Sequence, residues 1–281
     1  MQAASTDHFE NRYRALARQR AKRIALEGAD FIERRAAEEL LARLGATNRV
    51  FARAILVGDE TGLISAGLNT FYPDIDVTNV RVEELDREDN GFAPACFDLI
   101  ISGLSLHASA NLSTMLMQVN DLLAPDGLFM GALPGEGTLV ELRDSLLRAE
   151  AASGSGAGAR VEPFIDISTA GALLQQCGFT LPVVDMDRFV VRYSTLAGLI
   201  TDLRAMGATS TLDARARPVS RRARNLFQQF YQDNHSDSDG RLRASCNLVF
   251  MTAWTAHESQ QKPMRPGTAS VRLADYLNKE K

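Results

Sequence analysis

A short apolar run that turns through glycine is the segment of this sequence best suited to bind a ligand. In AILVGDETGLISAGL (54–68) the run ends at Gly58, two acids follow, and Gly62 opens a second apolar stretch. This pattern predicts a buried strand that turns into a helix, whose first N–H groups point at the ligand in nucleotide-type sites. Gly58 and Gly62 are therefore candidate contacts, although tight turns of any α/β unit also use glycine.

The middle of the same turn is chemically unusual, because Asp59-Glu60-Thr61 stands where a cofactor loop normally carries small residues. Asp59 and Glu60 are either an exposed pair of turn residues or part of the site. A carboxylate at Glu60 would crowd a ligand's own carboxylate and repel it. The turn thus combines the geometry of a cofactor site with chemistry that weakens it.

A histidine stands at the end of the clearest strand. FDLIISGLSL (97–106) is apolar on both faces, as a central parallel strand requires, and His107 follows it. His107 is a candidate general base, because an imidazole titrates near neutral pH, or a group that orients a neighbouring loop. His257 and Glu258, after the last apolar run, are more typical of a hydrogen-bonding cap.

Composition limits the class of protein. The chain of 281 residues is 45% hydrophobic and 23% charged, which is ordinary for one large globular domain with a modest addition. A net charge of −4 does not favour a nucleic-acid partner, and no apolar stretch reaches the length of a membrane span. We therefore expect a soluble, cytoplasmic protein. The cysteines lack metal-ligand spacing, so we expect no metal site and a reducing compartment: Cys96, Cys177 and Cys246.

The N-terminal segment is the one region with a charge bias. RYRALARQRAKR (12–23) carries six basic residues and no acid. Three interpretations stay open: a solvated helix, a basic arm that contacts an acidic partner or a membrane surface, and a transit peptide. Asp7 and Glu10 upstream argue against the transit peptide, because such segments are poor in acids. The predicted organisation is a helical arm over 1–45, a domain over 46–275 and a tail over 276–281.

Apolar periodicity predicts alternating strands and helices. The expected strands cover 52–58, 70–77, 77–85, 97–106, 128–133, 183–193 and 247–257. The expected helices cover 30–44, 62–68, 112–123, 138–152, 167–179, 195–207 and 221–233. The sequence APDG at 124–127 is expected to end one helix in a turn. This alternation predicts a doubly wound, mostly parallel α/β sheet of the seven-stranded, Rossmann-like type, whose last pair of strands is antiparallel.

Six motifs in chain order carry a family resemblance. ILVGDETG (55–62), FDLIISGLSLH (97–107) and LLAPDGLFMGAL (122–133) resemble the class I S-adenosylmethionine-dependent methyltransferases. GEGTLVELRDSL (135–146), ITDLRAMGATS (200–210) and AWTAHESQQKPMRPGTASV (253–271) are similar to one branch of that superfamily. The branch includes the mitochondrial respiratory complex I assembly factor, an arginine hydroxylase, and lies near the carrier-protein methyltransferase of biotin synthesis. The resemblance spans roughly residues 30–275 and implies S-adenosylmethionine as cofactor.

The resemblance also implies site residues. An acid after the second strand would accept the ribose hydroxyls, with Asp74 as first candidate and Asp76 as second, because a carboxylate accepts two hydrogen bonds there. Asp86 would bind the adenine amino group, and Phe92 would be the aromatic residue that follows it. The full set of implied cofactor contacts is Gly58, Asp59, Gly62, Asp74, Asp86 and Ser102.

Three departures from the family pattern leave the function open. Leu56 stands where an acid is expected, Glu60 replaces the middle glycine of the loop, and few residues remain for a helix after Asp76. One hypothesis is an S-adenosylmethionine-dependent enzyme that acts on a small molecule, a carrier-bound acyl group or a protein side chain, including a complex I subunit. The alternative is an assembly or binding protein that kept the fold without cofactor turnover. A hydroxylase would need an oxidant, for which the sequence shows no metal-ligand constellation. In a eukaryote, the resemblance implies the mitochondrial matrix.

Overall fold

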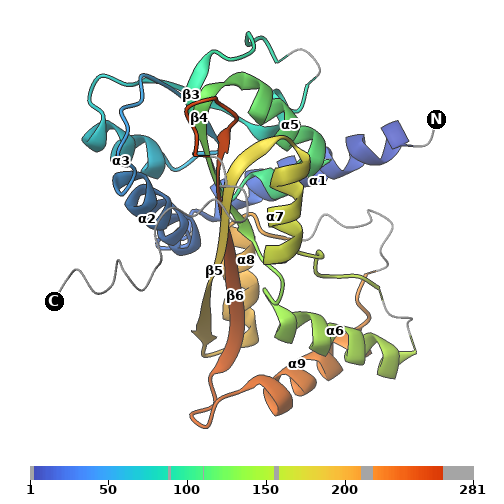
Figure 1. Cartoon of the computed structure of the whole chain (residues 1–281). Coiled ribbons are helices and arrows are strands. Elements are labelled where there is room, and N and C mark those ends of the chain that lie inside the picture. Colours follow the sequence, from blue (N-terminus) through green and yellow to red (C-terminus); the bar gives the residue numbers. More distant parts are fainter. Residues whose placement is uncertain (1–2, 88–89, 110, 155–157, 210–217, 262–281) are drawn as a thin grey trace, which may run out of the picture.

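A computed structural model describes residues 3–87, 90–109, 111–154, 158–209 and 218–261, which form an α/β structure around one sheet (Figure 1). The strands are β1 (Arg53–Val57), β2 (Asp76–Val80), β3 (Phe97–Gly103), β4 (Leu123–Pro134), β5 (Phe179–Tyr193) and β6 (Leu242–Thr255). The helices are α1 (Ala3–Ile24), α2 (Phe31–Gly45), α3 (Leu63–Phe71), α4 (Val82–Leu85), the 3-10 helix η1 (Leu106–Ala108), α5 (Leu112–Leu122), α6 (Val140–Ser153), α7 (Ile167–Gln176), α8 (Leu196–Ala205) and α9 (Arg221–His235).

The sheet has the order β2-β1-β3-β4-β6-β5. β2, β1, β3 and β4 are parallel, whereas β6 is antiparallel to both of its neighbours, β4 and β5. The expected mostly parallel sheet with an antiparallel C-terminal pair is confirmed. Within the described ranges it has six strands rather than the seven of the expected type.

The strand expected over 70–77 is absent, and that prediction is wrong, because α3 continues to Phe71 and β2 begins only at Asp76. The strand expected over 77–85 is correct only as far as Val80. β2 ends at Val80, and the next residues form the single-turn helix α4. Val80 and Val82 lie two residues apart, as in an alternating strand. Val82 and Leu85 lie three residues apart, so one helical turn buries both on the same side. Glu84 stabilises the start of α4, because its Oε2 accepts a hydrogen bond from Arg81 N at 3.0 Å.

The predicted turn at 124–127 also differs in the structure. β4 already begins at Leu123, directly after α5. Its pairing with β3 passes from Phe97–Leu123 to Leu99–Leu128, so the four residues between form a bulge inside the strand.

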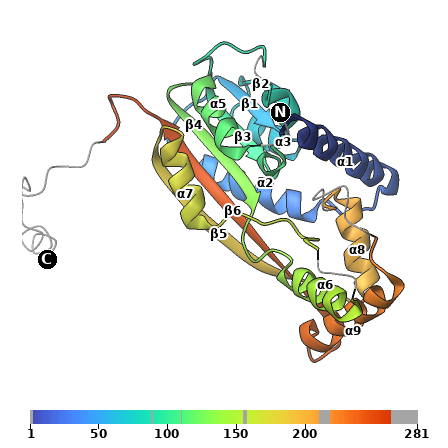
Figure 2. The same cartoon turned by 90° about the vertical axis from the view of Figure 1, so that its right-hand side faces the viewer.

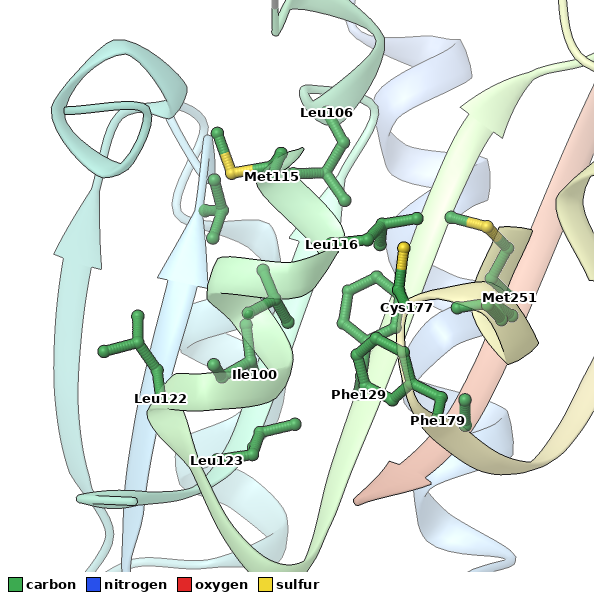
Figure 3. Close-up of a cluster of buried hydrophobic side chains, with 14 of the residues drawn as sticks. Ile100, Leu106, Met115, Leu116, Leu122, Leu123, Phe129, Cys177, Phe179 and Met251 are labelled. Carbon is green, nitrogen blue, oxygen red and sulfur yellow. The ribbon is translucent and has the colours of Figure 1, made fainter. Parts of the chain in front are cut away.

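Alternating side chains of β1 divide the core between the two faces of the sheet. Ala54 and Leu56 pack with α2 and α3, and Ile55 and Val57 pack with α4 and α5. Figure 3 shows the second face, where Phe129 of β4 meets Phe179 of β5 with ring centroids 5.5 Å apart. Leu56, which stands at the position of the expected acid, is fully buried, so an ionised carboxylate there would be costly.

The long strands β5 and β6 extend beyond the parallel part of the sheet and carry a third core with α6, α8 and α9 (Figures 1 and 2). Tyr231 of α9 is fully buried in it and donates a hydrogen bond to Arg243 O at 2.7 Å. Glu150 of α6, also buried, pairs with Arg160 at 2.6 Å. This extension forms a wall beside the carboxyl ends of the parallel strands.

The predicted N-terminal arm contains two helices with different surroundings. α2 belongs to the core, since Leu40 and Leu44 are fully buried, and Arg43 Nη2 donates to Asp185 Oδ1 of β5 at 2.9 Å. α1 packs on α8 and lies across the loops that follow β1, β2 and β3 (Figure 2). The predicted boundary at 45 is therefore not a boundary of packing, and the predicted tail over 276–281 lies outside the described residues.

We expect Leu40→Ala to lower the free energy of unfolding by about 2–5 kcal/mol, because it leaves a cavity between α2 and the sheet. Leu16→Ala on α1 is the control, since Leu16 is 44% exposed. Urea unfolding followed by circular dichroism measures both. Equal effects of the two variants would contradict this description of the core.

Candidate functional site

A cavity of about 1080 Å³ opens at the carboxyl ends of the parallel strands. Its wall includes Gly58 after β1, Arg81 after β2, Gly103 at the end of β3 and Pro134 at the end of β4. Ligands of doubly wound sheets bind at this edge, where the strand order reverses on either side of β1. The turn singled out in the sequence therefore faces an open cavity.

The floor of the cavity is a close contact between the turns after β1 and β3. Ser105 Oγ donates to Val57 O at 2.8 Å and lies 2.9 Å from Ser102 Oγ. A β-carbon at Gly58 would come within 2.3 Å of the Ser105 β-carbon, and the φ of Gly58 is +75°. Glycine is thus required here by packing and backbone conformation, whether or not a ligand is bound.

Asp59 caps the helix that follows. Its Oδ1 accepts a hydrogen bond from Ile64 N at 3.1 Å, and its Oδ2 accepts one from Ser65 N at 2.7 Å. These N–H groups at the start of α3 would otherwise favour an anion, so the protein's own carboxylate takes that place. Gly62, with φ of +71°, lets the chain turn into α3 and is absent from the wall of the large cavity.

Four acids gather beside Gly58. Glu33 of α2 lines the cavity, and burial, followed by the negative charges of Glu60, Asp30 and Asp59, raises its pKa to about 7. The pKa is raised because each nearby charge disfavours a further carboxylate. This end of the cavity therefore has a negative potential, which favours a cation.

The acid of the cavity wall that follows β2 is Glu83 of α4, three residues after the strand ends, and the sequence did not single it out. Glu83 lines the cavity and pairs with Arg18 of α1. Asp76 begins β2 and lies opposite Arg53 at the start of β1, and Asp74 precedes it, so both lie at the far edge of the sheet. A strand rises about 3.3 Å per residue, which places Asp76 about 13 Å from the level of Val80. The ribose assignments of Asp74 and Asp76 are therefore wrong.

The two remaining implied contacts lie behind the cavity wall. Ser102 is fully buried and bonds to Ser105, as described above. Asp86 ends α4, and its Oδ1 accepts a hydrogen bond from Ser109 Oγ at 3.2 Å. Both residues support the loops that form the site, and neither belongs to the wall of the cavity. Phe92 packs edge-on against Phe97, with ring centroids 5.4 Å apart.

Helix α1 closes the cavity through a row of cations. Arg14, Arg18 and Lys22 are spaced four residues apart, so they share one face of the helix. Arg14 donates to Ala108 O after β3, Arg18 pairs with Glu83 after β2, and Lys22 lies 3.7 Å from Glu60 after β1. The basic segment is thus not simply solvated, because each cation contacts a loop at the carboxyl ends of three neighbouring strands.

His107 faces the cavity, as the sequence suggested. Desolvation by the surrounding protein atoms lowers the pKa of His107 to about 4. The negative charge of Glu162 raises this pKa, and the positive charge of Arg14 lowers it further. The imidazole is therefore neutral near pH 7 and can accept a hydrogen bond or a proton. A general-base role stays a prediction.

The described ranges contain neither a metal-binding cluster nor a membrane-spanning helix. Within them, no three acids, histidines or cysteines come together in a way that could hold a metal ion. None of the described helices is both long and apolar enough to span a bilayer.

Comparison with known proteins was made at the level of family models, sequences and structures. No family model matches the chain. It is 34% identical over 190 residues to the mitochondrial arginine-hydroxylase NDUFAF5 of Danio rerio, covering 68% of this chain and 59% of that protein. It is 28% identical over 255 residues to a malonyl-[acyl-carrier protein] O-methyltransferase of Laribacter hongkongensis, covering 80% of this chain and 83% of that protein. The chain spans about three fifths of the length of the first of these relatives.

The chain also shares its fold with a solved structure. A putative methyltransferase from Bacillus halodurans superposes with a TM-score of 0.50 at 13% identity, covering 77% of this chain and 97% of that one. The chain therefore has the Rossmann-like methyltransferase fold, and its sequence is similar to both of these relatives.

The segment GEGT at 135–138 is shaped by packing. A β-carbon at Gly137 would come within 2.6 Å of Asn247 Nδ2, and the φ of Gly137 is +87°. Thr138 Oγ1 donates to Asn247 O and accepts from Asn247 N, both at 3.0 Å. These bonds hold the loop between β4 and α6 against β6, and they place Thr138 and Leu139 in the cavity wall.

The raised pKa of Glu33 predicts a pH effect on stability. Between the ordinary carboxyl pKa and about 7, the folded protein keeps a proton that the unfolded chain has released, so stability falls as pH rises through that range. Glu33→Gln should therefore raise the free energy of unfolding by on the order of 1–2 kcal/mol at about pH 8, and by nearly nothing at about pH 4. Urea unfolding across pH measures the difference.

The control for this experiment is Glu38→Gln, an exposed neighbour on the same helix. That variant should leave the pH dependence of the wild type unchanged. A Glu33→Gln curve parallel to that of the wild type would contradict the assigned pKa.

Proposed function

We propose that this chain is an S-adenosylmethionine-dependent enzyme that acts on a protein side chain or a carrier-bound group, with a role in respiratory complex I assembly. Its relatives support both kinds of substrate, since one is named as a mitochondrial arginine hydroxylase and the other as a carrier-protein methyltransferase. The location we propose is the mitochondrial matrix in a eukaryote and the cytoplasm in a bacterium.

The negative potential beside Gly58 is the observation that carries this proposal. S-adenosylmethionine has a sulfonium and an ammonium group, so a cluster of Glu33, Glu60, Asp59 and Asp30 suits it better than it suits an anionic ligand. The sequence analysis had treated Glu60 as an obstacle to the ligand's carboxylate. With Lys22 beside Glu60, the same region also offers a cation to that carboxylate.

The residues present fit such a cofactor. Glu83 of α4, just after β2, would accept hydrogen bonds from ribose hydroxyls in exchange for its pairing with Arg18. The cavity exceeds the roughly 300–1,000 Å³ of pockets that hold one drug-sized molecule, so a second group has room beside it.

When bound, the cofactor would supply an activated methyl group. The chain itself would orient the acceptor, exclude water by means of α1 and α8, and offer the neutral His107 as proton acceptor. None of these tasks requires a particular pair of residues that act as catalytic acid and base. The loop that holds the cofactor is the part that decides activity.

We expect S-adenosylmethionine to bind more tightly as pH rises through about 7, because a cationic ligand favours the ionised form of Glu33. Isothermal titration across pH should show this rise in the wild type and a flatter profile in Glu33→Gln. S-adenosylhomocysteine, which lacks the sulfonium charge, should show a smaller rise. A folded wild-type protein that gives no heat with either ligand would support the alternative, a binding protein without cofactor turnover.

A second test places the ligand against the turn itself. Thr61 is exposed and lines the cavity, so Thr61→Trp should fill part of it and weaken S-adenosylmethionine binding by about tenfold or more. Thr70→Trp is the control, because Thr70 is exposed on α3 outside the cavity wall. Equal affinities of the two variants would place the cofactor elsewhere.

A further inference from the structure

The cavity has a second part that the cofactor would not fill. It lies between α6, α8, α9 and the far halves of β5 and β6, and we call it the side chamber. Its wall is apolar and consists mainly of Leu142, Leu146, Val191, Leu199, Ile200 and Phe227. Leu146, Val191 and Ile200 are only partly buried, because they face the open space.

The side chamber is formed by other elements than those that carry the acids of the cofactor end. The chamber floor is β5 and β6, whereas Glu33 and its neighbours belong to α2 and to the turn after β1. Arg160 reaches the chamber wall, but its charge is matched by Glu150. An apolar void of this kind is poorly hydrated, so an apolar occupant is favoured.

Two exposed cations stand where the chamber meets solvent. Arg204 in the last turn of α8 and Arg224 in the first turn of α9 both line the cavity. Neither forms an ion pair with a residue of the described ranges, unlike Arg18 and Arg160. An apolar space whose rim cations have no ion-pair partner among the described residues is complementary to an amphiphile with an anionic head.

We propose that the side chamber binds the aliphatic chain of an anionic amphiphile, with the head near Arg204 and Arg224. The amphiphile is a fatty acid, whose carboxylate is the head, or an acyl-coenzyme A thioester, whose phosphates are the head. This inference deepens the proposed function, because the chamber opens onto the cofactor end and so defines the acyl part of a substrate. Binding of the aliphatic chain does not depend on the cofactor.

A cationic side chain fits the chamber less well. A guanidinium buried there would need a carboxylate partner, and the cavity's acids gather beside Gly58 and α1 instead. Glu162 lines the cavity close enough to His107 to affect its pKa, so it also belongs to the cofactor end. The chamber therefore selects for chain length and apolar surface rather than for positive charge.

The first experiment fills the chamber. The fluorescent polyene fatty acid cis-parinarate should bind the wild-type protein with enhanced emission, and Leu146→Trp should weaken its affinity by about tenfold or more. Leu147→Trp is a matched control, because Leu147 is the next residue of α6, is 40% exposed and lies outside the cavity wall. Circular dichroism confirms that both variants are folded. Absence of binding, or equal loss in both variants, overturns the proposal.

The second experiment tests the head group. The double variant Arg204→Ala/Arg224→Ala should weaken binding of cis-parinarate by about fivefold but leave binding of the corresponding alcohol unchanged. Arg222→Ala is the control, since Arg222 is exposed on α9 and outside the cavity wall. Equal effects on the acid and the alcohol would refute the role of the rim cations.

Competition with cis-parinarate shows whether the bound aliphatic chain belongs to a free acid or to a thioester. Displacement of cis-parinarate by oleate but not by oleoyl-coenzyme A supports a free acid, the reverse supports a thioester, and displacement by neither overturns the proposal. Titration with S-adenosylmethionine is run in parallel. A protein that binds cis-parinarate but not the cofactor would refute the proposed function alone, and the opposite result would refute the side chamber alone.

Discussion

The turns after β1 and β3 touch each other at Gly58 and Ser105, and the shape of the site depends on this contact. Ser105 reaches the carbonyl of Val57 only because Gly58 has no β-carbon. This contact holds the carboxyl ends of β1 and β3 together, and the cavity opens next to them. Asp59 adds to the same turn by capping α3, which fixes where that helix begins.

Charge divides the cavity into two ends. Acids surround Gly58, and burial, followed by the charges of the other acids, raises the pKa of Glu33 to about 7. At the other end, α6, α8 and α9 present apolar side chains, with cations only at the rim. A cationic cofactor and an apolar acceptor would therefore be sorted by electrostatics and hydration before any specific contact forms.

Helix α1 links the two ends. Its row of cations bonds to the loops after three strands, and the helix also packs on α8. Because Arg18 occupies the carboxylate of Glu83, a ligand that needs Glu83 must exchange with an ion pair. Half-exposed ion pairs contribute little each, so this exchange is energetically modest.

Sequence alone determined most of the strands, most of the helices and the position of the site, because apolar periodicity and glycine turns are local properties. It also determined the antiparallel C-terminal pair, which follows from two long apolar strands in succession. Local pattern failed over 80–85, where Val80 and Val82 have the spacing of a strand but Val82 and Leu85 have that of one helical turn. It failed again at Asp74 and Asp76, because only the register of β2 against β1 shows which edge of the sheet they occupy. The roles of Glu33, Glu83 and the α1 cations were decided by tertiary structure, since each depends on charges that lie far apart in the chain and meet only when the sheet and helices pack.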